Sequence, residues 1–376
     1  MSAASPIFAP MRLARLELAN RVVVAPMTRI SATNEGIATP RMVKYYQRFA
    51  GGGFGLIITE GIYTDGAYAQ GYAGQPGLAN LDQARAWRTI VDAIHANGGR
   101  IFAQLMHAGA LSQGNRHRSH TIAPSAVQPR GTQMTIYAGS GPYRVPRAMT
   151  EGEILGAIDG FANAARLAIE VACFDGIEVH AANGYLLDQF LTEHTNLRTD
   201  RWGGSTPNRL RITLDTVHAI RAAIGHDAAL GVRISQAKVN DHTHRWRGGK
   251  DTAHSIFGAL AEAPIDFVHT TEHEAWRPAF AATGPSLVQC ARRAAPQLRI
   301  IANGGLHDSD RALEMLDHGA DLLSLGRGAL ATPNWPVRVA RGMPLQSFDA
   351  SMLSPLAHIK DWEVRGRDSL SLEDCA

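Results

Sequence analysis

"GIEVHAANGYLLDQFLTEHTN", residues 176–196, joins an apolar strand pattern to a group of polar side chains. Its opening residues are small or apolar, which is typical of a strand buried on both faces. An imidazole, an amide and a phenol then follow at His180, Asn183 and Tyr185. His180 alone could be a satisfied core histidine. The three residues together raise the question of what a strand end with this chemistry would bind.

The same kind of apolar run recurs along the chain. Each run is short, rich in Val, Ile and Leu, and bounded by Gly or polar residues, as expected for buried parallel strands. The eight runs cover residues 21–27, 54–61, 100–107, 176–182, 228–235, 266–272, 299–305 and 321–328.

Helical patterns lie between these runs. The segment 150–176 opens with Thr150 and Glu153, the spacing of a capping box, and its apolar residues then repeat every three or four positions. The other predicted helices cover 80–99, 205–225, 284–296 and 308–320.

Alternation of strands and helices predicts parallel strands joined by right-handed crossovers. Eight such units favour a closed (β/α)8 TIM barrel of the α/β class over an open doubly wound sheet with a second domain. The first strand is not followed by G-x-G-x-x-G, so a dinucleotide-binding Rossmann unit has no support.

The sequence predicts a single domain over residues 1–376. An N-terminal lead-in covers 1–20, and a C-terminal extension covers 343–376. The connection 108–149 is unusually long, and loops of that length inside a domain are often functional lids. We expect it to cover one end of the barrel and to contain a short hairpin.

Charge and hydropathy give little support to macromolecular partners. The net charge is only +3, and Lys and Arg are scattered, so nucleic-acid binding is not expected. No apolar run reaches the roughly 18 residues of a membrane span. The start has no signal-peptide pattern. A cytoplasmic protein is therefore expected, either a monomer or a homo-oligomer.

The cysteines argue against a metal or disulfide framework. Cys173, Cys290 and Cys375 are far apart and form no CxxC, so neither a zinc ribbon nor an iron–sulfur cluster is indicated. His242 and His244 could ligate zinc, but they lie in a polar loop without evident further ligands. No metal site is expected.

Polar residues at the predicted strand ends mark the site, because TIM barrels build their active sites there. Glycines after the last two strands can let an anion approach main-chain N–H groups, and Arg327 adds a guanidinium suited to phosphate. Each glycine could also serve only a tight turn. A buried Arg233 needs an anion or several acceptors, and Glu178 is one alternative partner. The strand-end residues are Pro26, Met27, Thr28, Gly61, Gln104, His180, Arg233, Asn303, Gly304, Gly305, Gly326 and Arg327.

Longer motifs extend over nearly the whole chain. They are LANRVVVAPMTR (18–29), YYQRFAGGGFGLIITEG (45–61), QLMHAG (104–109), HAANGYLLDQFL (180–191), NLRTDRWGGSTPNR (196–209) and ADLLSLGRGALATPNWP (320–336). In these motifs the chain resembles the old yellow enzyme family of FMN-dependent ene-reductases.

The resemblance implies a non-covalent FMN with NAD(P)H as the reductant. It places the flavin phosphate on residues 303–305, Gly326 and Arg327, and it places residues 26–28 and Gly61 around the ring. Gln104 would bond the pyrimidine edge. Arg233 would stabilise the anionic reduced ring.

The resemblance also implies reduction of the activated C=C of an α,β-unsaturated carbonyl or nitro compound. Hydride would come from flavin N5, His180 and Asn183 would hold the acceptor oxygen, and Tyr185 would supply the proton. The residue types suit this chemistry, because two N–H donors stabilise the oxygen of an enolate. A phenol with a pKa of about 10 can protonate the adjacent carbon at neutral pH.

Some positions depart from the common family pattern. Thr28 stands where some members have Cys, and Gln236 stands where Pro is frequent. Residues 237–251 do not match a general family pattern; they could recognise NAD(P)H, shape the pocket or form a solvated basic loop. An oxidative flavin dehydrogenase or demethylase acting on a small amine or alcohol is an alternative, as is a non-catalytic flavin-binding protein.

Overall fold

Eight parallel strands form a closed barrel in the computed structural model, which describes residues 5–365. Pairing of the second strand with the third closes the ring. The predicted TIM barrel is therefore confirmed, and the strands fall inside or close to the predicted runs. They are β3 (Val22–Val24), β4 (Leu56–Ile58), β6 (Ile101–Met106), β9 (Gly176–Asn183), β10 (Ala229–Lys238), β11 (Phe267–Thr271), β12 (Arg299–Asn303) and β13 (Leu322–Leu325).

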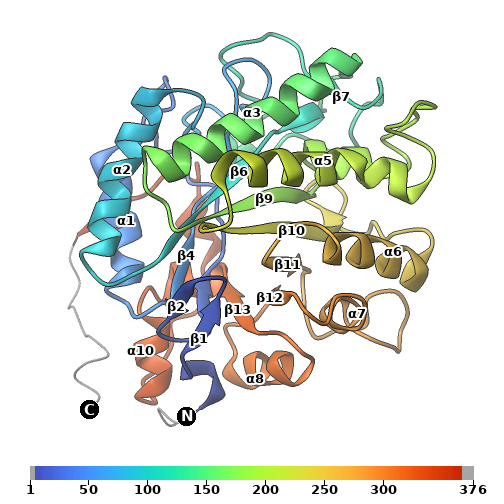
Figure 1. Ribbon diagram of the computed structural model, residues 1–376. Helices are drawn as coiled ribbons and strands as arrows, with labels where there is room; N and C mark the ends of the chain where they lie inside the picture. Colours follow the sequence, from blue (N-terminus) through green and yellow to red (C-terminus); the bar gives the residue numbers. More distant parts are fainter. Residues whose placement is uncertain (1–4, 366–376) are drawn as a thin grey trace.

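Helices lie around the outside of these strands (Figure 1). The capping box of Thr150 and Glu153 is present at the start of its helix, as predicted. That helix ends at Glu170, several residues before the predicted end, because residues 171–175 turn into β9 with Cys173 at φ +60°. The main helices are α1 (Pro40–Ala50), α2 (Leu81–His95), α3 (Glu151–Glu170), α5 (Thr206–Ile224), α6 (Gly249–Ala261), α7 (Leu287–Ala294), α8 (Ser309–Asp317) and α10 (Trp335–Ala340).

Short elements complete the chain. Most of them are caps and loop structure, whereas β5 belongs to the barrel sheet and pairs in parallel with β6. They are η1 (Pro6–Phe8), β1 (Met11–Leu13), β2 (Leu16–Leu18), β5 (Ile62–Tyr63), η2 (Gly109–Leu111), β7 (Ile122–Ala123), η3 (Thr135–Tyr137), β8 (Arg147–Ala148), α4 (Leu186–Leu191), α9 (Arg327–Ala331), η4 (Ala350–Leu353) and α11 (Asp361–Val364).

The antiparallel hairpin β1–β2 closes the amino-terminal end of the barrel. Its Leu13 and Leu18 are buried in one apolar cluster with inward-facing residues of the barrel strands. In that cluster the rings of Phe102 and Phe267 stack at 5.7 Å between centroids. Gly231 makes room for them, because a Cβ there would stand 2.5 Å from the Phe267 ring. This packing leaves the carboxyl ends of the strands as the open mouth.

The excursion 108–149 is not a simple hairpin. Its strands β7 and β8 pair in parallel, with Ile122 opposite Arg147. These two strands therefore do not form a hairpin, because the chain between them crosses back instead of turning tightly. One isolated antiparallel bridge joins Thr132 to Pro142 within the loop. The excursion brings Tyr137 to the apolar cluster that contains Tyr185.

The C-terminal segment is fixed to the barrel by a buried ion pair between Arg29 and Glu363. Nη1 of Arg29 lies 2.8 Å from Oε1 of Glu363, and Nη2 lies 2.5 Å from Oε2. Both side chains are 1% exposed. Arg48 donates to the same carboxylate at 3.0 Å. Because Arg29 follows Thr28 directly, this pair also fixes the loop after β3.

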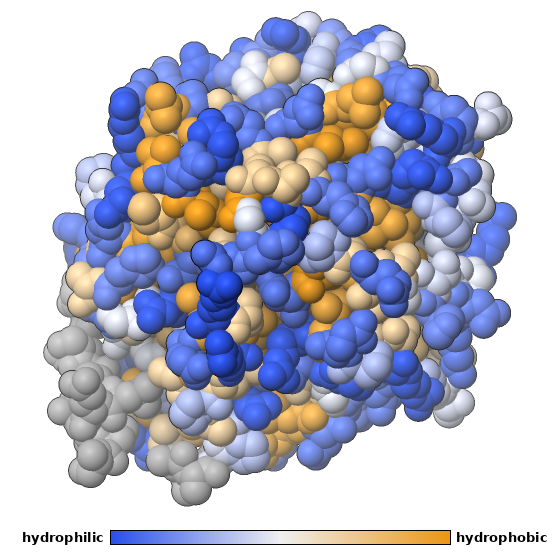
Figure 2. Space-filling view, viewed as in Figure 1, coloured by the Kyte–Doolittle hydropathy of each residue, from blue (hydrophilic) through white to orange (hydrophobic). Residues whose placement is uncertain are grey.

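Charged and polar side chains cover much of the face seen in Figure 2, with apolar side chains in scattered patches. Within residues 5–365, the helices fall short of the length and apolar character needed to cross a bilayer.

Replacing Glu363 with Gln is expected to lower the free energy of unfolding by about 3–5 kcal/mol, because Arg29 and Arg48 lose their buried counter-charge. Burial opposes ionisation of Glu363, but Arg29 and Arg48 outweigh it and hold its pKa below the usual value. The difference between wild type and E363Q should therefore be complete above about pH 5 and shrink as the pH falls below about 4.

Urea unfolding at several pH values measures this difference. The control is Glu17→Gln, which breaks an exposed pair with Arg12 at 3.8 Å and should cost less than about 1 kcal/mol. Equal losses in the two variants would show that the buried pair has no special role.

Candidate active site

A buried guanidinium dominates the mouth of the barrel. Arg233 on β10 donates from Nη2 to Thr271 Oγ1 at 3.1 Å and to Asn303 Oδ1 at 3.0 Å. Its Nε and Nη1 atoms are buried and have no partner within residues 5–365. Burial lowers the pKa of Arg233 to about 10, so the group is still a cation at neutral pH. Two nitrogens of a buried cation, with three free N–H bonds, fit an electron-rich carbonyl and ring nitrogen, as on a flavin.

Asn303 holds this guanidinium in place. Its Oδ1 also accepts from Thr271 Oγ1 at 2.7 Å, and its Nδ2 donates to the Ser324 carbonyl at 2.9 Å. The side chain that the sequence assigns to phosphate binding is therefore engaged in orienting Arg233.

The alternative ion pair between Arg233 and Glu178 is wrong as a direct contact. Glu178 instead accepts from Gln104 Nε2 at 2.8 Å and bonds His269 Nδ1 at 2.7 Å. These side chains lie in the buried interior of the barrel. Because Glu178 takes the NH2 group of Gln104, the amide oxygen of Gln104 remains for the edge of a flavin.

Of the residues predicted to border the ring, Gly61 lies next to Gln104. A Cβ on Gly61 would lie 2.7 Å from Met106 Sδ and 3.5 Å from Gln104 Oε1, so a larger residue would require Met106 to move. Pro26, Met27 and Thr28 follow β3 and are each partly buried.

The predicted phosphate loops come together at the ends of β12 and β13. Gly304 has φ +139° and Gly305 has φ +70°, values that side chains rarely adopt. A Cβ on Gly304 would stand 2.3 Å from the Glu272 carbonyl oxygen. Tight packing thus explains why glycine is required at these positions. Without side chains, the main-chain N–H groups there can also approach an anion closely. Gly326 precedes α9, whose first residue, Arg327, is exposed.

His180 on β9 is a neutral hydrogen-bond donor. Burial, together with Arg233 and His269, holds the pKa of His180 well below its usual value. Its Nδ1 lies 3.3 Å from the Ala182 N–H, which makes Nδ1 the acceptor. The assigned tautomer therefore carries its proton on Nε2.

Asn183 ends the same strand in a left-handed conformation, with φ +62°. Its N–H donates to Ser235 Oγ at 2.8 Å, and its carbonyl accepts from the Val239 N–H at 3.1 Å. Both contacts come from β10 or the residue after it. They fix the main chain of Asn183, so the position of its half-buried amide is set by the barrel.

Tyr185 lies next to His180, with ring centroids 4.9 Å apart in an edge-to-face arrangement. Its hydroxyl is 2.5 Å from the hydroxyl of Tyr72. Burial raises the pKa of both tyrosines. Tyr137 packs on Tyr72 at 4.5 Å and is hydrogen-bonded to Thr28; burial raises the pKa of Tyr137 to about 12.

Sequence reasoning missed Tyr72 and Tyr137. Tyr72 lies between β5 and α2, and Tyr137 ends the short helix η3 of the excursion. Neither segment has a strand or helix periodicity, so no pattern in the sequence could assign these rings to the site.

The loop 237–251 is not uniformly solvated. His244 and Trp246 are buried, whereas His242, Arg245 and Arg247 are exposed. Nδ1 of His244 lies 2.9 Å from a carbonyl oxygen of β10, that of Gln236. His242 and His244 therefore face different surroundings. Among the described residues, no group of three or more potential ligand side chains is placed to hold a metal ion.

The chain matches the model of the NADH:flavin oxidoreductase / NADH oxidase family over residues 6–346. Chanoclavine-I aldehyde reductase of Penicillium roqueforti is 34% identical over 351 residues, which cover 91% of each protein. Putative 12-oxophytodienoate reductase 3 of Oryza sativa subsp. japonica is also 34% identical, over 93% of this chain and 89% of the relative.

Solved structures agree. The old yellow enzyme homologue from Zymomonas mobilis superposes with a TM-score of 0.85 at 31% identity, covering 96% of this chain and 98% of that one. Morphinone reductase in complex with tetrahydroNAD gives a TM-score of 0.81 at 29% identity, covering 97% and 100%. The chain therefore belongs to the NADH:flavin oxidoreductase family that includes the old yellow enzymes, with FMN as its cofactor and NAD(P)H as its reductant.

Proposed function

We propose that this protein reduces the activated C=C of α,β-unsaturated carbonyl or nitro compounds. The observation that carries the proposal is the arrangement at the end of β9: His180 as a neutral Nε2–H donor, the amide of Asn183 on a fixed main chain, and the buried hydroxyl of Tyr185. Relatives named as reductases of 12-oxophytodienoate, chanoclavine-I aldehyde and morphinone support an acceptor that carries a carbonyl group.

Two N–H donors at one oxygen suit this reaction. Addition of hydride to the C=C moves negative charge onto the carbonyl or nitro oxygen. Donors that are already in position stabilise that charge more in the transition state than in the ground state. His180 can donate without being a cation, because its pKa is lowered. Its hydrogen bond is therefore the same throughout the neutral pH range.

Bound FMN supplies the two-electron carrier between NAD(P)H and the acceptor. The chain would hold it through Arg233, the Gln104 oxygen and the main chain around Gly61, with Gly304, Gly305, Gly326 and Arg327 at the phosphate. Pro26, Met27 and Thr28 would border the ring. Arg233 would contribute a fixed positive charge at the edge where reduction adds electron density.

Tyr185 is proposed as the proton donor. A buried phenol with a raised pKa stays protonated at neutral pH, and it transfers its proton only to a strong base such as an enolate carbon. The Tyr72 hydroxyl lies 2.5 Å from that of Tyr185; with Tyr72 as the donor of this hydrogen bond, the Tyr185 proton is free for the substrate.

A substrate panel tests the function. Purified protein is reduced with NADH or NADPH, and reoxidation of its flavin is followed with cyclohexenone, maleimides, nitroalkenes and small amines or alcohols. The proposal requires rapid reoxidation by an enone, maleimide or nitroalkene. If amines or alcohols instead reduce the oxidised flavin and none of those acceptors reoxidises it, the oxidative alternative is correct.

Replacing His180 or Asn183 with Ala is expected to lower enone turnover by about 10²–10³, because each change removes one donor to the acceptor oxygen. The same variants should lose binding of phenol, which is followed by its charge-transfer absorbance with the flavin. The control is His226→Ala, at an exposed histidine near the opposite end of the barrel. A phenol affinity as strong as that of wild type in His180→Ala would contradict the assignment.

Replacing Tyr185 with Phe is expected to lower kcat for enones by about 10²–10⁴ while enone affinity changes little, because the oxygen donors remain. With the pKa of Tyr185 raised and that of His180 lowered, neither group titrates between about pH 7 and 9. The rate of reoxidation by enone should be flat over that range in wild type. A titration of this step near pH 8 would refute the assigned protonation states.

Replacing Arg233 with Met should weaken flavin binding by about tenfold or more, because charged hydrogen bonds to the ring are lost. Dissociation is measured by the fluorescence of released flavin. Arg85→Met, which changes an exposed arginine on α2, should leave flavin affinity unaltered. Equal flavin affinity in the two variants would exclude Arg233 from the flavin site.

A further inference from the structure

Behind the loop that carries Asn183 and Tyr185 lies a buried ion pair outside the proposed catalytic group. Nζ of Lys238, near the end of β10, is 2.6 Å and 2.8 Å from the two carboxylate oxygens of Asp188 on α4. The side chains are 4% and 0% exposed. A buried pair of this kind often adds little net stability compared with apolar side chains, so its presence calls for a positional explanation.

Asp188 holds the peptide between the two site residues. Its Oδ2 accepts from the N–H of Gly184 at 2.7 Å, and its Oδ1 accepts from Thr192 Oγ1 at 3.3 Å. Gly184 has φ +87° and joins Asn183 to Tyr185. A change in the position of the carboxylate therefore acts directly on the turn that sets both side chains.

Lys238 reaches the same turn from the other strand. It is paired with Asn183 in the β9–β10 register, after an irregularity in β10 between Ile234 and Lys238. The next residue, Val239, donates its N–H to the Asn183 carbonyl. Lys238 and Asp188 thus join β10 to α4 across residues 183–185.

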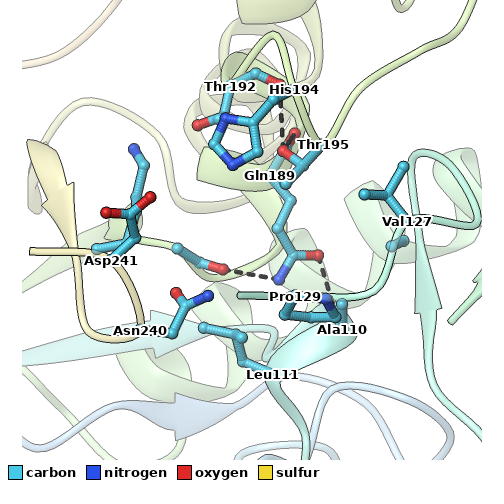
Figure 3. Close-up of a pocket in the computed structure, with 13 residues that line it drawn as sticks. Ala110, Leu111, Val127, Pro129, Gln189, Thr192, His194, Thr195, Asn240 and Asp241 are labelled. Carbon is cyan, nitrogen blue, oxygen red and sulfur yellow. Dashed lines mark hydrogen bonds between the residues drawn. The ribbon is translucent and has the colours of Figure 1, made fainter. Parts of the chain in front are cut away.

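A pocket borders this turn on one side (Figure 3). Gln189 spans it: Nε2 donates to the Gly184 carbonyl at 2.7 Å, and Oε1 accepts from the Ala110 N–H at 3.0 Å. Gly184 and Lys238 both line the pocket. The turn is also closely packed on this side, because a Cβ on Gly184 would lie 2.9 Å from Asn240 Oδ1 and 3.2 Å from Lys238 Cβ. Side-chain hydrogen bonds and these contacts together hold it beside the pocket.

We propose that the Asp188–Lys238 pair is a positioning device that fixes Asn183 and Tyr185 in their ligand-binding arrangement; this rests on the proposed function. Lys238 supplies the counter-charge that lets Asp188 stay buried beneath the turn. Without it, a carboxylate held by one N–H and one hydroxyl is driven toward water, and it takes the Gly184 peptide with it.

Phenol titration of the flavin-loaded protein tests the proposal. Lys238→Met should weaken phenol affinity roughly tenfold while the flavin content stays that of wild type. Adding Asp188→Asn should restore the affinity to within about threefold of wild type, because a buried amide needs no counter-ion. A side chain with a merely general role in stability would not give this recovery.

The matched control breaks a different cation–carboxylate pair, between Arg221 and Asp266. Arg221 is largely buried and donates to Asp266 at 2.9 Å and to the Ala228 carbonyl, before β10 and β11 begin. Arg221→Met should lower the thermal unfolding temperature and leave phenol affinity unchanged. A comparable loss of phenol affinity in Arg221→Met would overturn a local role for Lys238.

A second readout is amide hydrogen exchange of the peptide that contains residues 183–186. Its exchange should rise in Lys238→Met, return to the wild-type rate in the double variant and stay unchanged in Arg221→Met.

If wild type fails to bind phenol, the proposed function fails, whereas hydrogen exchange still decides the role of the pair. Unchanged exchange in Lys238→Met overturns the proposal. If Lys238→Met does not fold, Asp188→Asn alone takes its place; if neither folds, the pair serves the fold and the proposal is overturned.

Discussion

The site depends on one buried cation that lacks a carboxylate partner of its own. Arg233 is held by the neutral oxygens of Thr271 and Asn303, and the N–H bonds of its Nε and Nη1 atoms remain for a ligand. Its positive charge also helps to keep His180 neutral. The same guanidinium thus offers N–H groups to a ligand and helps to keep His180 neutral. A closed barrel allows this, because the ends of β9 to β12 meet at one mouth and the interior excludes water.

The barrel and the loops contribute in different ways. Strand positions supply Gln104, His180 and Arg233, whose orientation is limited by the alternation of side chains along each strand. Loops supply the aromatic rings of Tyr72 and Tyr137, which surround the hydroxyl of Tyr185. The barrel therefore places the residues proposed to hold the flavin and the acceptor oxygen, whereas irregular segments place the rings around Tyr185.

Local patterns in the sequence were sufficient to predict the barrel and much of the candidate site. The apolar runs predicted all eight barrel strands, and the capping box placed the start of α3. The strand-end residues gathered at one mouth, because parallel strands place their carboxyl ends together. The motifs shared with the old yellow enzyme family predicted FMN as the cofactor. Composition and periodicity alone would not have predicted it.

Long-range side-chain contacts were beyond such reasoning. The sequence offered Glu178 as a partner for Arg233, whereas Glu178 contacts Gln104 and His269. The parallel pairing of β7 with β8 depends on how a long loop crosses itself. The contact of Asp188 with Lys238 joins residues 50 positions apart in sequence. No periodicity connects such segments.

The Arg29–Glu363 pair has a consequence for protein synthesis. Its two residues are 334 positions apart, so the guanidinium beside Thr28 gains its carboxylate only after the segment around Glu363 has been synthesised. The first strand loop, which would border the flavin, can settle only after the last described segment has docked. A chain that stops before Glu363 would therefore leave Arg29 buried without its counter-charge, next to the loop that follows β3.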